Sequence, residues 1–132
     1  MATFEVISAA AIGGGGSSVA GYTSGTLIYV ALLTQTGTNA PVATVLQNTL
    51  GGTVVWTRNA EGDYRGTLSG VFTANKTWLL ANVNNNNDIA VSSLPSSFLR
   101  TSNDVVSLQT ANGADLIDSV LSSTSIQILV YP

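Results

Sequence analysis

Seven carboxylates are the residues of this chain best suited to proton transfer, and their spacing sets up no catalytic pair. They are Glu5, Glu61, Asp63, Asp88, Asp104, Asp115 and Asp118. A glycosidase needs two carboxylates that face each other across a substrate, one of them with a raised pKa. Glu61 and Asp63 are the closest in sequence, but they fall in a predicted hairpin turn, where such residues normally serve as solvated turn formers.

Histidine and cysteine are both absent from the chain. Their absence removes the commonest general base and the commonest metal ligand, and it excludes disulfides and thiolate metal sites. Serines are numerous, yet Lys76 is the one residue left to act as their base, which does not favour nucleophilic catalysis. We therefore predict a protein that is not an enzyme, with no catalytic residue, no metal site and no cofactor.

Two short tracts have compositions that also occur in ligand-binding loops. The run Gly13, Gly14, Gly15 and Gly16 could form a phosphate loop, but no Lys-Ser or Lys-Thr pair and no helix follow it, so a flexible hinge is predicted. The asparagines at residues 84–87, followed by Asp88, offer oxygen ligands for calcium. They lack the regular alternation and the distal glutamate of a calcium loop, so we predict a polar loop there.

Trp56, Tyr64 and Trp78 could together form a platform on which a sugar ring stacks. Large aromatic residues at alternating strand positions are more often part of a core. Trp56 and Trp78 are therefore retained as candidate glycan contacts, with core packing as the competing interpretation.

Charged residues make up 8% of the 132 residues, against about 25% in typical soluble domains. The four cations are scattered and the net charge is −3, which argues against nucleic-acid binding through a basic patch. A surface of Ser, Thr, Asn, Gln and Gly repels a neighbour weakly and so tolerates close packing of subunits. Residues 1–11 lack the positive start of a secretory signal, and the longest apolar run is too short to span a bilayer, so no membrane association is expected.

That apolar run, residues 27–33, is the centre of the predicted fold. Both of its alternating sets are apolar: Leu27, Tyr29, Ala31 and Leu33 point one way, and Ile28, Val30 and Leu32 point the other. A strand of this kind is normally buried on both faces. Its second face is covered either by a neighbouring subunit or by a loop of the same chain, and both alternatives remain open.

The clearest hairpin joins residues 53–58 to residues 64–71 through a turn at residues 59–63. Pairing Trp56 with Gly66 gathers the apolar residues on one side and leaves room for the indole over the glycine. That side carries Val54, Trp56, Tyr64, Leu68 and Phe72.

Further strands are predicted at residues 3–8, 41–48, 76–82, 89–94, 98–101, 104–110 and 125–131. Residues 114–121 have helical spacing and are the one helix candidate, with a strand as the alternative. The fold class is therefore all-β: an antiparallel β-sandwich, jelly-roll or Ig-like, of about eight strands with at most one short helix near the C-terminus. Residues 1–18 are predicted to be an N-terminal arm with a glycine-rich hinge, and residues 19–132 the sandwich domain.

A series of motifs resembles a set of small uncharacterised proteins encoded by tailed bacteriophages and prophages. They are YVALLTQ at residues 29–35, GTNAPVATVL at 37–46, NTLG at 48–51, WTR at 56–58, Tyr64, GTL at 66–68, NKT at 75–77 and SIQILVY at 125–131. The resemblance covers residue 29 to the C-terminus and excludes the arm. It implies a structural role on the virion and carries no catalytic residues.

We therefore expect a non-enzymatic virion protein, such as a capsid decoration, head-fibre or tail-associated subunit. It is expected to be a homo-oligomer, a trimer in the first instance, whose arm docks on a neighbouring copy or on another virion protein and adds a strand there. The residues assigned to assembly are Phe4, Val6, Gly13, Gly14, Gly15, Gly16, Ile28, Tyr29, Val30 and Leu32. The alternatives are a β-sandwich module that binds a surface glycan and a subunit of an extracellular filament.

Overall fold

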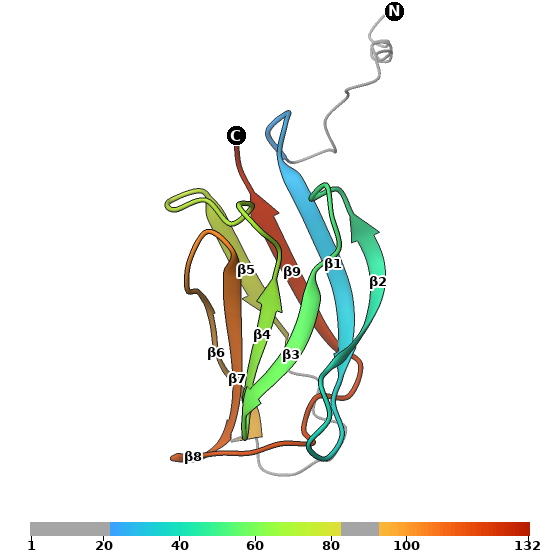
Figure 1. The fold of residues 1–132 in the computed structure, drawn as a ribbon, viewed down its shortest axis with the longest axis vertical. Coiled ribbons are helices and arrows are strands. Elements are labelled where there is room, and N and C mark those ends of the chain that lie inside the picture. The colour runs from blue at the N-terminus through green and yellow to red at the C-terminus, as the bar shows by residue number, and fades with distance from the viewer. Residues whose placement is uncertain (1–21, 83–92) are drawn as a thin grey trace, which may run out of the picture.

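The computed structural model describes residues 22–82 and 93–132, which form nine β-strands in two antiparallel sheets (Figure 1). The strands are β1 (Leu27–Thr34), β2 (Val42–Asn48), β3 (Val55–Ala60), β4 (Asp63–Thr67), β5 (Thr77–Ala81), β6 (Ser93–Arg100), β7 (Val105–Asn112), β8 (Asp115–Leu116) and β9 (Thr124–Val130). The predicted all-β sandwich is confirmed, and the described residues contain no helix. The predicted arm and the polar tract at residues 84–88 lie outside the described residues.

The two sheets divide the strands between them. The β1 sheet has the order β2-β1-β9-β5, and the β4 sheet has the order β3-β4-β7-β6, with β8 paired to the end of β7. β1 and β9, the first and last described strands, therefore lie side by side at the centre of one sheet, as Figure 1 shows.

The core lies between the two sheets and draws on nearly every strand. From the β1 sheet, Tyr29, Ala31 and Leu33 alternate inward along β1, and Ile126, Ile128 and Val130 do so along β9. The β4 sheet and its flanking loops complete the cluster with Leu50, Val54, Trp56, Tyr64, Phe72, Val106, Leu108 and Leu121. Of the two alternating sets of residues 27–33, the one that contains Tyr29, Ala31 and Leu33 therefore faces the core.

The hairpin of β3 and β4 has the register expected from its sequence. Trp56 pairs with Gly66, and Arg58 pairs with Tyr64. A Cβ atom on Gly66 would lie 3.0 Å from the indole of Trp56, so the glycine does give the ring its space. The indole N–H donates a hydrogen bond of 3.2 Å to the hydroxyl of Tyr29 on the opposite sheet, which satisfies both groups inside the core.

Residues 114–121 do not form the candidate helix, and the alternative, a strand, holds for part of them. Asp115 and Leu116 form β8, and the backbone N–H of Ile117 donates to the carbonyl of Thr110 on β7. Thr110 in turn donates its side-chain hydroxyl to the carbonyl of Ile117, at 2.6 Å. Because the backbone N–H and carbonyl of Ile117 are hydrogen-bonded to β7, they do not form helical hydrogen bonds. The helical spacing of the apolar residues therefore does not produce a helix.

The predicted break at residues 95–97 is also wrong. β6 continues through Pro95 with a shift of register between Pro95 and Ser97. Proline removes a backbone donor, but β6 is an edge strand, so one of its sides has no ladder to satisfy.

Two turn glycines share a backbone conformation but have different surroundings. Gly62 and Gly113 have φ of 63° and 66°. A Cβ atom on Gly62 would lie 2.6 Å from the amide nitrogen of Ile117 and from the carbonyl oxygen of Thr110, whereas one on Gly113 would meet nothing within 4 Å. The two positions therefore separate backbone strain from steric exclusion.

We expect Gly113→Ala to lower the free energy of unfolding by about 1–2 kcal/mol, the cost of a left-handed conformation for alanine. Gly62→Ala should lower the free energy of unfolding by about 1–3 kcal/mol more than Gly113→Ala does, because its methyl group must displace backbone atoms of β7 and the following loop. Urea unfolding followed by tryptophan fluorescence measures both variants. Equal losses would show that the close packing around Gly62 does not contribute.

Candidate functional site

A polar cluster surrounds Asp118, in the loop between β8 and β9. Arg58 of β3 donates from both Nε and Nη2 to its carboxylate, with the shortest contact at 2.6 Å. The backbone N–H of Gly62 donates to Oδ1 at 2.9 Å. This two-pronged arginine contact is the strong form of a charge-assisted hydrogen bond.

Tyr64 connects this carboxylate to the β1 sheet. Its hydroxyl lies 2.8 Å from Asp118 Oδ1 and 2.9 Å from Gln35 Oε1, and its single proton can serve only one of the two acceptors at a time. Gln35, which directly follows β1, also accepts from the backbone N–H of Ser119 at 2.7 Å. Its amide group donates to the carbonyls of Gly37 and Asn39. The cluster therefore ties the β8–β9 loop to both sheets.

The protonation states of the cluster do not suit acid–base catalysis. Hydrogen bonds from Arg58, assisted by Gly62 and Tyr64, lower the pKa of Asp118 to about 2. Burial, together with the hydrogen bond to Asp118, raises the pKa of Tyr64 well above its ordinary value. Neither group titrates near neutral pH, where a general acid or base works best. The arrangement is that of a structural clamp.

Asp63 is buried, contrary to the expectation of a solvated turn residue. Although burial by itself raises the pKa of its carboxyl, hydrogen bonds from Asn59, Arg65 and Ser107 hold that pKa below the ordinary value. It begins β4, and its partners come from the hairpin and from β7. The buried carboxylate of Asp63, like that of Asp118, therefore holds neighbouring strands together.

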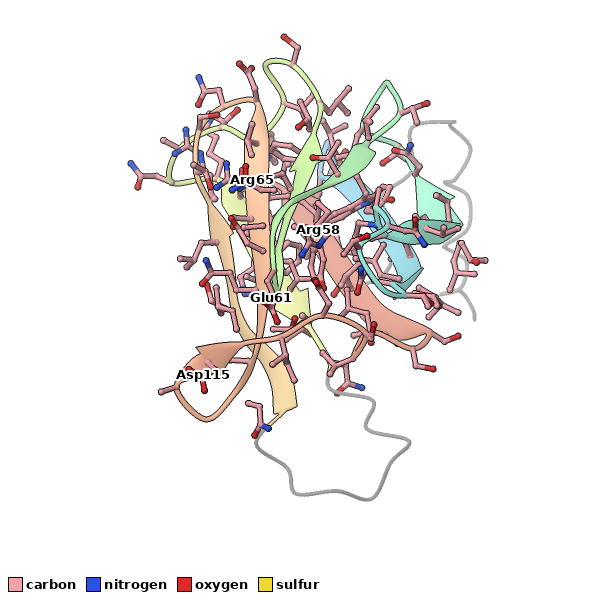
Figure 2. The ribbon with its side chains drawn as sticks, turned by 60° about the horizontal axis from the view of Figure 1, so that its bottom comes forward. Arg58, Glu61, Arg65 and Asp115 are labelled. Atoms are coloured by element: carbon pink, nitrogen blue, oxygen red, sulfur yellow. The ribbon has the colours of Figure 1, made fainter. Side chains whose placement is uncertain are left out.

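The remaining carboxylates do not form a site. Glu61, Asp104 and Asp115 are exposed, and Asp115 lies out at the β7–β8 turn, away from Arg58 and Arg65 (Figure 2). Within residues 22–82 and 93–132, no group of three or more His, Cys, Asp or Glu residues could hold a metal ion. Glu5 and Asp88 lie outside the described residues.

The second candidate is the side of the β1 sheet that points away from the core, here called the outer face. It consists of the outward side chains of β1, β9 and β5: Ile28, Val30, Leu32, Ser125, Gln127, Leu129, Trp78 and Leu80. Ile28 and Leu129 are buried although they do not belong to the core. Val30 and Leu32 are half-buried, whereas Trp78 and Leu80 are 45% and 49% exposed.

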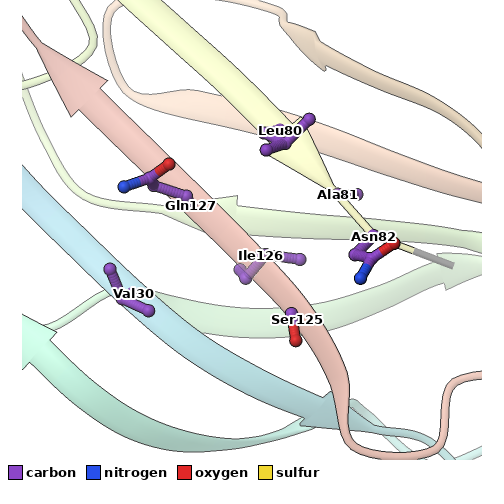
Figure 3. Close-up of a pocket in the computed structure, with 7 residues that line it drawn as sticks. All are labelled: Val30, Leu80, Ala81, Asn82, Ser125, Ile126 and Gln127. Carbon is purple, nitrogen blue, oxygen red and sulfur yellow. The ribbon is translucent and has the colours of Figure 1, made fainter. Parts of the chain in front are cut away.

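The outer face is hollowed where its strands run side by side. A hollow of about 330 Å³ is lined by Val30, Leu80, Ala81, Asn82, Ser125, Ile126 and Gln127 (Figure 3). Val30, Gln127 and Leu80 form one row across β1, β9 and β5, because Gln127 pairs with both of the others. The lining is mainly apolar, with amide groups from Gln127 and Asn82.

The structure separates the residues that the sequence assigned to binding. Tyr29 and Trp56 lie in the core, so neither presents a surface to a partner or a sugar ring. Ile28, Val30 and Leu32 lie on the outer face together with Trp78. Phe4, Val6, Gly13, Gly14, Gly15 and Gly16 lie outside the described residues. Sequence reasoning missed Leu80 and Gln127, although the two-residue spacing of Trp78 and Leu80 places both on one face of a strand.

No family model, no curated protein and no solved structure matches this chain. In the part of the chain that the structure describes, no helix has the length and apolar character needed to cross a membrane.

The clamp predicts a specific dependence of stability on pH. Because the folded-state pKa of Asp118, about 2, lies below the ordinary value of about 3.9 for aspartate, its stabilising effect is complete above pH 4 and is lost as the pH falls toward 2. Asp118→Asn should reduce the free energy of unfolding at pH 7 by about 1–3 kcal/mol, because Arg58 loses its charged partner. The difference from wild type should shrink between pH 4 and pH 2.

Urea unfolding at a series of pH values measures this effect. Asp115→Asn is the matched control, since it removes the same charge from an exposed turn. An Asp118→Asn difference that stays constant down to pH 2 would contradict the role assigned to the ion pair.

Proposed function

We propose that this chain is a non-enzymatic structural subunit of a bacteriophage virion, as a capsid decoration, head-fibre or tail-associated protein that acts through self-assembly. The observation that carries the assembly role is the outer face of the β1 sheet, where Trp78 and Leu80 remain about half exposed beside an apolar hollow. The resemblance of its motifs to small proteins of tailed phages and prophages suggests the virion as the place of assembly.

The core is complete without the side chains of the outer face. This supports a role for the outer face in contact with another surface. The core cluster closes between the two sheets of one chain and leaves out the outward side chains of β1 and β5. A contiguous exposed apolar patch on a small domain is typical of an interaction site.

The edge of the same sheet is similarly suited to association. β2 is an edge strand without a charged residue, and it exposes Val42, Val45 and Leu46. Natural edge strands are normally protected by charges, prolines or bulges. Here the β1–β2 pairing has one irregularity, next to Leu46, and no lysine, so the edge remains able to pair with another chain.

The cations offer little opposition to such contacts. Arg58 and Arg65 pair with Asp118 and Asp63 of the same chain. Arg100 donates to the carbonyl of Phe72 and to the side chain of Asn103. With three of the four cations engaged internally and few charges overall, repulsion between copies is weak, which favours self-association.

Mass spectrometry of purified phage particles tests the virion role, and the protein should be present in a fixed copy number. Its absence from particles would refute the proposal. For the isolated full-length protein, light scattering should show an oligomer that Leu80→Asp weakens. Leu99→Asp is the control, because Leu99 is also exposed, at 61% against 49% for Leu80, but lies on the β4 sheet. A stable monomer at high concentration would contradict self-assembly.

One observation favours a second function, the binding of a surface glycan. The indole of Trp78 is exposed on the same face as the amide groups of Gln127 and Asn82, which is a pairing of ring and polar groups suited to a sugar. Trp56 cannot take part, because it is buried and hydrogen-bonded to Tyr29. A glycan array should then show binding by the wild type that Trp78→Ala abolishes, and an array without binders would exclude this function. The third alternative, a filament subunit, predicts fibres of the isolated protein in electron micrographs.

A further inference from the structure

We propose that the hollow of the outer face is the docking site for the N-terminal segment of this chain, residues 1–21. The inference rests on the proposed assembly role and refines it by naming the partner of the outer face. Three independent observations support it: where the described chain begins, how far the preceding segment can reach, and which side chains that segment carries.

The described chain begins on the outer face itself. The side-chain amide of Gln127 donates a hydrogen bond of 3.1 Å to the hydroxyl of Tyr22, a residue 105 positions earlier in the sequence. Gln127 lines the hollow and lies between Val30 and Leu80 in the row across the sheet. The segment that precedes Tyr22 is therefore tethered next to the hollow.

The tether is long enough for the segment to reach any part of this face. Neighbouring strands lie about 4.8 Å apart, so the row from β1 to β5 is about 10 Å wide. A flexible, glycine-rich linker of the length that separates Ile7 from Tyr22 has a root-mean-square span of about 20 Å. Such a short tether gives an effective concentration in the millimolar range, so weak contacts are enough for docking.

The chemistry of the segment matches that of the hollow. Its large apolar side chains are those of Met1, Phe4, Val6, Ile7, Ile12 and Val19, and its one charged side chain is that of Glu5. In an extended chain, Glu5 points away from the side that carries Phe4 and Val6. The hollow offers the side chains of Val30 and Leu80 to these apolar groups, and the amides of Gln127 and Asn82 to a backbone.

Other occupants fit the hollow less well. A mainly apolar lining provides few of the polar partners that a sugar requires. A second outer face would bring its own strands against the hollow and leave it unfilled, whereas a single segment can insert side chains into it. The same contact can form within one chain or between copies that exchange their segments, as in domain swapping.

Trp78 is a built-in reporter for this contact. It lies on the outer face, while Trp56 is only 7% exposed, so quenching of fluorescence by acrylamide reports mainly on Trp78. In the full-length protein, Phe4→Ser with Val6→Ser should increase this quenching and shift the emission to longer wavelength. The control, Ala9→Ser with Ala10→Ser, introduces the same number of hydroxyl groups but removes no large apolar side chain and should leave both signals unchanged.

A peptide of residues 1–16 then tests the site directly. Added to the full-length Phe4→Ser, Val6→Ser protein, it should restore the protection of Trp78, and a peptide with the same two serines should bind on the order of 100-fold more weakly. Leu80→Asp in the protein should abolish the binding, and Leu99→Asp should not. Circular dichroism confirms that each variant is folded.

The outcomes separate this inference from the proposed function. Protection of Trp78 that is independent of protein concentration identifies the chain's own segment, and protection that grows with concentration identifies a neighbour's; both support the inference. Equal quenching in the wild type and in the Phe4→Ser, Val6→Ser variant would overturn it, whatever mass spectrometry finds in phage particles.

Discussion

The antiparallel pairing of β1 with β9 is the constraint on which the rest of the structure depends. It runs from Leu27 opposite Val130 to Leu33 opposite Thr124, and it joins the two ends of the described chain. β2 and β5 add to this pair on either side, and its inward side chains form the part of the core that the β4 sheet covers. Because the pairing spans nearly the whole sequence, the sandwich cannot close until distant segments meet.

The same pairing explains the surface that the protein presents. A strand with apolar residues in both alternating sets has two faces to cover, and the β4 sheet covers only one of them. On the other face, Trp78 and Leu80 of β5 extend the apolar surface beside Val30, and Tyr22 reaches Gln127 of β9. The apolar surface of the outer face is thus a consequence of how the central strands are built.

The polar groups serve stability. In a chain without histidine, the ion pair of Arg58 and Asp118 and the hydroxyl of Tyr64 hold the β8–β9 loop against both sheets. Each of these groups has its partners, and the shifts in the pKa values of Asp118 and Tyr64 keep both in one protonation state over the physiological range. Clamping this loop fixes the point where β9 begins, and with it the register of the central pair.

The amino-acid sequence alone predicted the all-β class, most strand positions and the pairing of Trp56 with Gly66, because two-residue alternation and turn residues act locally. It also showed that β1 is apolar on both faces. The tertiary structure places residues 114–121 in a short strand and a loop, because Thr110 of β7 binds the backbone of Ile117 and Arg58, 60 positions away in the sequence, binds the carboxylate of Asp118. It likewise separated Trp56 from Trp78, since the face of a strand that turns inward depends on which sheet packs against it.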